Sequence, residues 1–176
     1  MSAAEAPGSG TVAPEAAGYL ARAVALAVRN VGSAGGPFGA LVVAPDGQVF
    51  EGTNRVTASN DPTAHAEVVA IRAACAGLGR YELSGCVLYS SCEPCPLCLS
   101  AALWGRLDRV YFAADRYAAA AAGFDDAAFY DYIQGKAGQG HSGEAGSALL
   151  PVEQVLVPES VEPFRSWAAL DTRTEY

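Results

Sequence analysis

Two short motifs bring together side chains that bind metal ions. His65-Ala66-Glu67 offers an imidazole and a carboxylate, and Cys95-Pro96-Leu97-Cys98 offers two thiols three positions apart. Residues three apart on a helix share one face, so both thiols can bind one ion. Two thiolates and one neutral imidazole supply three of the four ligands that zinc prefers, and they leave the fourth tetrahedral position for water. The motifs therefore predict an open, catalytic zinc site.

Glu67 is predicted to carry protons rather than to bind the metal. It lies two positions beyond His65, where it is poorly placed as a ligand but well placed to take a proton from water at the fourth position. The alternative is a closed structural site, which needs a fourth Cys or His. The remaining residues of these types lie before the second motif's helix, in segments with a buried pattern, or in a Gly-rich connector: Cys92, Cys75, Cys86 and His141.

The elements that must position these motifs alternate between helix and strand. Apolar spacing predicts helices near 15–31, 64–76, 94–104, 118–122, 127–133 and 161–170, and strands near 40–44, 48–53, 86–91, 109–113 and 152–157. Each motif begins a helix that follows a strand and a loop, so both helix N-termini can open at one edge of a sheet. This order indicates an α/β domain in which helices cover a mixed central sheet. Residues 1–14 are expected to form a disordered tail, and 135–146 a Gly-rich connector.

Composition and charge restrict the function further. The 176 residues suit one domain, and 51% hydrophobic with 17% charged residues exclude a disordered chain. The apolar runs are far shorter than a membrane span. There are 11 Lys and Arg residues against 19 Asp and Glu, a net charge of −8. Such a surface repels phosphate backbones, so a small neutral substrate is expected rather than a nucleic acid.

The cysteines indicate the compartment. Their number is odd, at 5, and no basic segment followed by an apolar stretch precedes them. This pattern favours reduced thiols and metal binding over a disulfide framework. We therefore expect a cytoplasmic protein.

The two motifs together are similar to those of the zinc-dependent nucleobase and nucleoside deaminases. Longer segments resemble one branch of that superfamily, the bacterial guanine deaminases: Gly35-Gly36-Pro37-Phe38-Gly39-Ala40, Asn60-Asp61-Pro62-Thr63-Ala64-His65-Ala66-Glu67, Ser91-Cys92-Glu93-Pro94-Cys95-Pro96-Leu97-Cys98, Gly123-Phe124-Asp125-Asp126 and Glu175-Tyr176. The resemblance runs from about residue 19 to 176. It is interrupted between Gln134 and Pro151, where the connector is longer than usual.

The resemblance implies a three-layer α/β/α cytidine-deaminase-like fold with a central mixed five-stranded sheet, formed by residues 15–176. It also implies a homodimer in which the C-terminal segment, about 158–176, is exchanged as a lid over the partner's site. One zinc ion per subunit would be held by His65, Cys95 and Cys98, with Glu67 as the proton shuttle. The implied substrate contacts are stacking on the purine by Phe38, hydrogen bonds from Asn54 and to Asp126, and closure by Tyr176.

Each implied substrate contact has a structural alternative. Phe38 is compatible with a core position, and Asn54 with the end of a strand. Asp125 or Asp126 is compatible with the N-cap of the helix that follows. Tyr176 is compatible with a frayed terminus.

The reaction that the resemblance implies is hydrolysis of guanine to xanthine and ammonia. Three alternatives remain open. The first is a deaminase of a related amine-bearing heterocycle, such as guanosine, a cytosine-type base or an aminotriazine. The second is a tRNA-editing adenosine deaminase, which the net charge disfavours. The third is a zinc-stabilised interaction module without activity.

Overall fold

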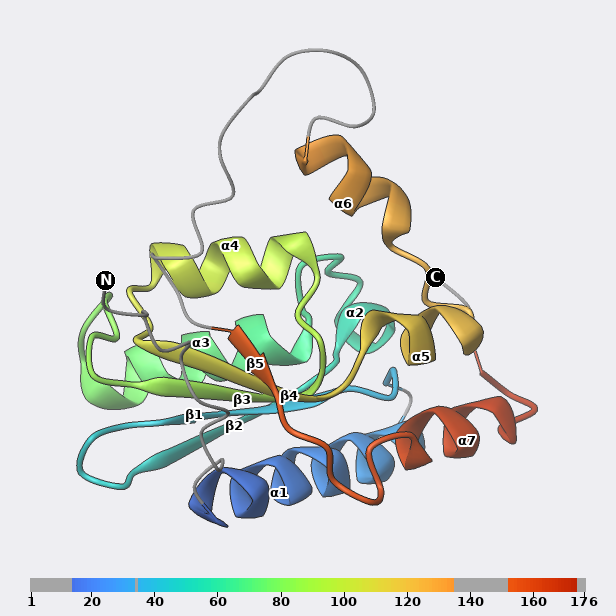
Figure 1. Cartoon of the computed structure of the whole chain (residues 1–176), viewed down its shortest axis with the longest axis horizontal. Coiled ribbons are helices and arrows are strands. Elements are labelled where there is room, and N and C mark those ends of the chain that lie inside the picture. The colour runs from blue at the N-terminus through green and yellow to red at the C-terminus, as the bar shows by residue number, and fades with distance from the viewer. Residues whose placement is uncertain (1–13, 34, 135–151, 174–176) are drawn as a thin grey trace, which may run out of the picture.

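A mixed β-sheet forms the centre of the molecule (Figure 1). The computed structural model describes residues 14–33, 35–134 and 152–173. Five strands pair in the order β2-β1-β3-β4-β5. β1 is antiparallel to β2 and β3, whereas β4 is parallel to β3 and β5. The strands span Gly39–Val43 (β1), Val49–Thr53 (β2), Val87–Cys92 (β3), Arg109–Ala114 (β4) and Val152–Gln154 (β5).

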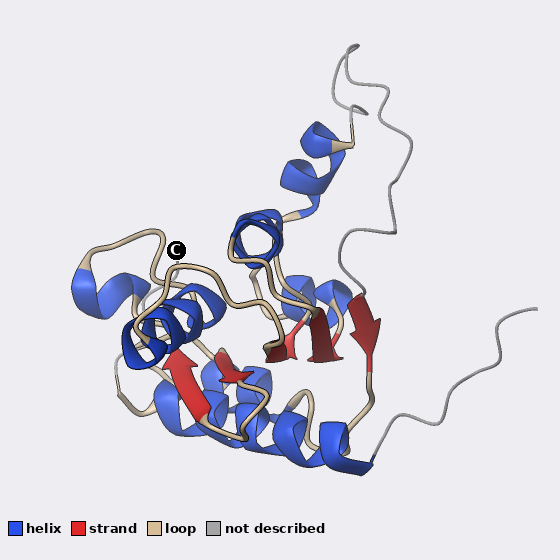
Figure 2. Cartoon of the chain, turned by 90° about the vertical axis from the view of Figure 1, so that its left-hand side faces the viewer, coloured by secondary structure: helices blue, strands red, loops and turns tan. Residues whose placement is uncertain are grey.

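Helices cover both faces of this sheet, which gives the three layers seen in Figures 1 and 2. α1 and α7 lie together on one face, and α3 and α4 lie on the other. α5 and α6 follow β4 in the chain and lie beyond its carboxyl end (Figure 1). The helices span Pro14–Val31 (α1), Val56–Ser59 (α2), Ala66–Leu78 (α3), Pro96–Trp104 (α4), Arg116–Ala121 (α5), Ala127–Ile133 (α6) and Glu162–Ala168 (α7).

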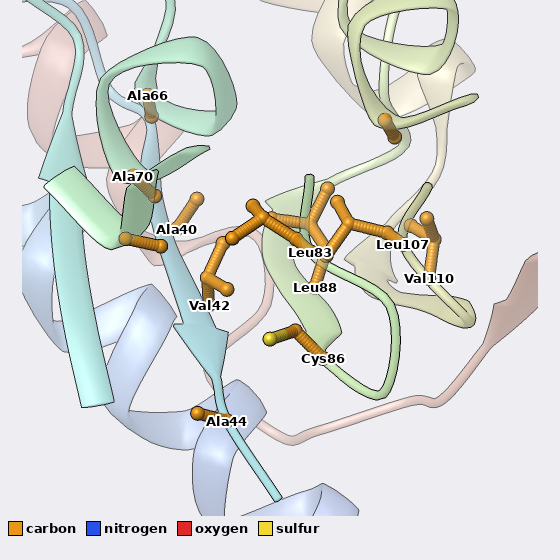
Figure 3. Packing of buried hydrophobic residues seen from close by; sticks show 12 residues of the cluster. Ala40, Val42, Ala44, Ala66, Ala70, Leu83, Cys86, Leu88, Leu107 and Val110 are labelled. Atoms are coloured by element: carbon orange, nitrogen blue, oxygen red, sulfur yellow. The ribbon is translucent and has the colours of Figure 1, made fainter. Parts of the chain in front are cut away.

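Alternating strand residues supply the two cores. Leu41 of β1 packs against Leu20 and Val24 of α1, because successive side chains of a strand point to opposite faces. Its neighbours Ala40 and Val42 pack on the other face, against the small side chains of α3 (Figure 3). Alanines let that helix approach the sheet closely.

Helix α3 lies close against the sheet at Gly52 of β2. A Cβ atom there would collide with the backbone oxygen of Ala66 and the backbone nitrogen of Ala70, both on α3. Glycine at this position therefore allows the first turn of α3 to lie directly on the sheet. That turn carries the first metal-binding motif.

The predicted fold class is confirmed, with differences at the ends of elements. Pro14, assigned from the sequence to the tail, is the first residue of α1. The predicted strand 152–157 is shorter, since β5 ends at Gln154, and the loop before the first motif contains the one-turn helix α2. The rest of the tail, and the connector 135–146, lie outside the described residues. Within the described ranges, no helix is both long and apolar enough to span a membrane.

Candidate metal centre and active site

The two motifs meet because each begins a helix. His65 is the N-cap residue of α3 and Cys95 is the N-cap residue of α4, with Pro96 in the first turn. Neither side chain caps its own helix, so the imidazole and the thiol remain available to a ligand. The N-termini of both helices, with their partial positive charge, therefore point toward the same place.

The loop before His65 is fixed by Asp61. Its Oδ1 accepts hydrogen bonds from the backbone N–H of Thr63 at 2.8 Å and from the Thr63 hydroxyl at 2.7 Å. The two ends of the loop are joined by the N–H of Arg55, which donates to the carbonyl of Ala64 at 2.9 Å. These bonds set the direction from which His65 enters the site.

His65, Cys95 and Cys98 form a cluster that suits one metal ion. The Nδ1 atom of His65 lies 3.6 Å from Sγ of Cys95 and 3.5 Å from Sγ of Cys98. All ligand atoms of the three lie within 4.8 Å of one another. One nitrogen and two sulfurs at these separations fit three corners of a tetrahedral zinc site. The prediction that these residues come together is confirmed.

The charge of the cluster is shared unequally between its thiols. A hydrogen bond from Cys98, with help from His65, lowers the pKa of Cys95 to about 4. Because it donates that hydrogen bond, Cys98 has a pKa far above the ordinary range. The hydrogen bond to Cys95 also raises the pKa of His65. Cys95 is therefore the more acidic of the two thiols and the one that more readily forms the thiolate that zinc binds.

Glu67 lies beside the cluster and is buried. Its carboxylate accepts a hydrogen bond from the Ser90 hydroxyl at 3.1 Å, and its Oε2 lies 3.4 Å from Sγ of Cys98. Burial, and after it the charge of Cys95, raises the pKa of Glu67. A carboxylate with raised proton affinity next to a metal site is suited to accept and return protons.

A cavity of about 610 Å³ opens over the cluster. It is lined by every predicted catalytic and substrate-binding residue that the structure describes: Phe38, Asn54, Glu67 and Asp126. His65 and Cys95 also line it, whereas Cys98 is fully buried. Tyr176, the remaining predicted contact, lies outside the described residues.

Asn54 presents its amide to this cavity in one orientation. Its Oδ1 accepts the N–H of Val56 at 3.2 Å, so the Nδ2 group is the part free to donate to a ligand. The backbone of Asn54 is held by Asn30, whose Nδ2 donates to the Asn54 carbonyl at 2.8 Å and to the Gly36 carbonyl at 2.9 Å. A Cβ at Gly35 would collide with both asparagines, so glycine there permits the contact.

The structure divides the roles of the two neighbouring aspartates. Oδ1 of Asp125 accepts the N–H of Ala127 at 3.0 Å, at the start of α6. Asp126 contributes its backbone carbonyl to α6, which accepts the N–H of Phe129 at 2.9 Å. Burial, and after it the charge of Cys95, raises the pKa of the Asp126 carboxyl. Asp125 is therefore engaged at the helix start, and Asp126 is the better candidate for a substrate contact.

Phe38 belongs to a cluster of aromatic rings beside the cavity. Its ring meets Phe124 edge-on at 5.0 Å between centroids and Phe164 of α7 at 5.7 Å. Trp167, also on α7, lies 5.6 Å from Phe124. Phe38 is thus both a packing residue and a wall of the cavity, and the C-terminal helix reaches the site through it.

Sequence reasoning missed Ser90 and Asn30. Ser90 is a polar residue within the buried strand β3, and that position was a signal that its hydroxyl needs a partner. Asn30 is 4% exposed near the end of α1. Its contacts with Gly36 and Asn54 depend on the path of the loop after α1, and no local sequence pattern predicts them.

Comparison with known proteins agrees with this geometry. Residues 15–114 match the family model of the cytidine and deoxycytidylate deaminase zinc-binding region. The guanine deaminase of Bacillus subtilis is 46% identical over 159 residues, which cover 90% of this chain and 97% of that protein. Its crystal structure superimposes with a TM-score of 0.64 at 47% identity, again covering 90% and 97% of the two chains.

Two further proteins have a lower sequence identity to this chain. A guanine deaminase structure from Nitrosomonas europaea has a TM-score of 0.71 at 26% identity and covers 91% of this chain and 87% of its own. The tRNA-specific adenosine deaminase of Agrobacterium fabrum is 41% identical over 78 residues, which are 44% of this chain and 51% of that protein. The chain belongs to the cytidine and deoxycytidylate deaminase zinc-binding family, and it is a zinc-dependent hydrolytic deaminase.

Proposed function

We propose that this protein hydrolyses guanine to xanthine and ammonia. One cavity joins the His65, Cys95 and Cys98 cluster and Glu67 to an aromatic wall and two polar groups suited to a purine. That arrangement carries the proposal. The relative with 46% identity over 90% of this chain is a guanine deaminase, which favours the same substrate.

Zinc held by His65, Cys95 and Cys98 supplies a Lewis acid that makes water acidic enough to lose a proton near neutral pH. Glu67 accepts that proton as the water oxygen attacks C2 of guanine. It then gives the proton to a ring nitrogen, while the bond from that nitrogen to C2 becomes single. The raised pKa of Glu67 favours its holding the proton between these two transfers.

The second transfer releases the product. Glu67 takes the remaining proton of the added hydroxyl and passes it to the exocyclic amine, which leaves C2 as ammonia. The oxygen remains as the new carbonyl of xanthine. One water is consumed and one ammonia is formed, so the carboxylate ends as it began.

Three groups that line the cavity are proposed to hold the substrate. Nδ2 of Asn54 donates to an acceptor of the purine, since its Oδ1 is occupied by Val56. The Asp126 carboxylate accepts from purine N–H groups, and the ring of Phe38 packs against the base. A lid at Tyr176 would suit a free base and would leave little room for ribose.

The test is ammonia release by the zinc-loaded protein on guanine, guanosine, cytidine and adenine in parallel. Fast turnover of guanine alone is expected. Turnover of guanosine without guanine would contradict the closed pocket. A protein that binds zinc and deaminates none of these would contradict the proposal.

We further propose that the protein is a cytoplasmic homodimer. The α4 helix carries no charged residue, and Leu97, Leu103 and Trp104 on it are exposed, Trp104 by 89%. In a chain of net charge −8, an uncharged apolar face lets two copies approach without repulsion. All five cysteines are free, which suits a reducing compartment. Trp104→Glu is expected to give monomers in light scattering, and an unchanged dimer would contradict this interface.

We also propose that residues 15–176 form one deaminase domain and that its C-terminal segment, about 158–176, is exchanged between subunits as a lid. The contact of α7 with Phe38 puts this segment beside the cavity, and the same contacts can be made by a partner's copy. Co-expression of Glu67→Gln with a chain truncated after residue 170 tests the exchange. In an exchanged dimer, the intact tail covers the site that keeps Glu67, so activity returns. A tail retained by its own chain gives no rescue.

A further inference from the structure

A salt bridge joins the loop before Cys95 to the start of α5. Glu93 pairs through Oε1 with Nη2 of Arg116 at 2.6 Å, and its Oε2 accepts the Arg116 backbone N–H at 3.0 Å. Glu93 is two positions before the metal-binding Cys95. Its side chain is 16% exposed and that of Arg116 is 32% exposed, so the pair is partly shielded from water.

The same guanidinium lies on the ring of Tyr130. The Arg116 Cζ atom is 3.9 Å from the Tyr130 ring centroid, well within the range of a cation–π contact. The Tyr130 hydroxyl in turn donates to the carbonyl of Pro94 at 2.7 Å. Glu93, Arg116, Tyr130 and Pro94 therefore form a closed cycle of contacts, which we call the Arg116 clamp.

Tyr130 is the anchor of α6. Of the α6 side chains that the structure describes, it is the one that is not exposed, whereas Phe129 and Ile133 are 64% and 60% exposed. Figures 1 and 2 show this helix projecting from the body of the molecule. The placement of α6, and of Asp126 immediately before it, thus depends on the contacts of Tyr130.

The position of Arg116 leaves one of its donor groups without a hydrogen bond. Its Nε atom is buried without a hydrogen-bond partner among the described residues. An unsatisfied buried donor is unfavourable, so the ion pair and the ring contact must compensate for it. Arg116 also lines the cavity together with Glu93 and Asp126.

We propose that Arg116 is a positioning residue, which clamps Glu93 of the metal-binding loop to Tyr130 of α6 and thereby fixes Asp126 against the substrate. This rests on the proposed function, because it takes Asp126 as a group that binds the purine. The clamp sets the distance between the metal side of the cavity and its substrate-binding wall. It therefore acts on substrate affinity rather than on the chemical step.

The first test measures the clamp without activity. Arg116→Met keeps the length of the side chain and removes its charge and stacking plane. Hydrogen exchange of residues 127–133 is expected to accelerate at least about tenfold, while β4 is unchanged. Arg22→Met is the matched control, because Arg22 makes an exposed ion pair with Glu51 at 2.8 Å and neither residue lines the cavity. Equal protection of α6 in wild type and Arg116→Met would overturn the clamp.

The second test uses guanine kinetics. Arg116→Met is expected to raise KM about tenfold and to change kcat less than about threefold. Tyr130→Phe keeps the ring under the guanidinium and loses only the bond to Pro94, so a smaller rise of about threefold is expected. Zinc content should be unchanged in both variants. Loss of zinc would assign the effect to the metal loop and overturn the proposal.

A double-mutant cycle identifies the group through which Arg116 acts. In an Asp126→Asn background, Arg116→Met should raise KM less than about twofold, because the contact it positions is already gone. A full tenfold rise in that background would show independent effects and refute the role. If the wild type fails to deaminate guanine, the proposed function falls, and hydrogen exchange alone then decides whether the clamp exists.

Discussion

Glu67→Gln should abolish catalysis while the site stays intact. Glutamine has the size of glutamate, so it fits a position that is 6% exposed, and its carbonyl can still accept the Ser90 hydroxyl now 3.1 Å from Glu67. It cannot accept a proton. A positioned acid–base group contributes roughly 10²- to 10⁴-fold. Glu67 serves two successive transfers, and two thiolate ligands cancel the formal charge of zinc. We therefore expect kcat to fall at least ~10³-fold.

The assay pairs ammonia release from guanine with metal analysis of the same sample. The variant should retain about one zinc per subunit, since its ligands are unchanged. KM should stay within about threefold of wild type, because Glu67 acts mainly in the transition state. This combination separates loss of chemistry from loss of metal.

Ser90→Ala provides the matched control. It removes the hydrogen bond that orients Glu67 and leaves the carboxylate, so a loss of about tenfold in kcat is expected. Turnover by zinc-loaded Glu67→Gln within tenfold of wild type would refute the assignment of the proton shuttle. A Ser90→Ala loss as large as that of Glu67→Gln would show that orientation, rather than proton affinity, limits the reaction.

The packing and charge of the site lead to three further predictions. Gly52→Ala places a Cβ against the backbone of Ala66, so the free energy of unfolding should fall by about 2 kcal/mol and zinc should be lost more readily. Gly18→Ala, where nothing lies within 4 Å of the added Cβ, should be neutral or stabilising. Denaturant unfolding measures both variants. Asp126 must be ionised to accept purine N–H groups, so kcat/KM should fall as pH drops through its raised pKa, at a higher pH than the ordinary 3.8; an acid limb unchanged in Asp126→Asn would contradict this. Removal of zinc by a chelator should lower Tm, and zinc should restore it; a Tm that does not respond would contradict a metal bound to the native state.

The metal centre was predictable because local rules determine it. His65 and Cys95 each precede an apolar helical pattern, and Pro96 suits a first helical turn. Local spacing places Cys98 in the first turn of α4. The remaining step, the meeting of α3 and α4 at one place, follows from both being crossover elements on one face of the sheet.

The supporting contacts were not predictable by the same rules. Arg116 and Glu93 are 23 residues apart, and Tyr130 and Pro94 are 36 apart. Their pairing depends on how β4 and β3 align and on the path of the chain after β4. No local pattern distinguishes Arg116 from a solvated arginine at the start of a helix. The resemblance implied Asp126 as the substrate contact, but the residues alone left either aspartate open as the cap of the next helix, and the hydrogen bond from Ala127 assigns Asp125 to the helix start.

Function and stability oppose one another at Glu67. In an unfolded chain its carboxyl ionises near the ordinary glutamate value of 4.5, whereas in the fold its pKa is raised by burial and by Cys95. The protonated form therefore favours folding, and stability is lost as pH rises through the folded pKa. The same features, a water-poor site and a neighbouring thiolate, make the carboxylate hold a proton well enough to carry it. The helix N-termini at His65 and Cys95 offset part of this negative charge without supplying a group that competes for the proton. Catalytic proton transfer here therefore depends on a buried carboxyl group whose ionisation destabilises the folded protein.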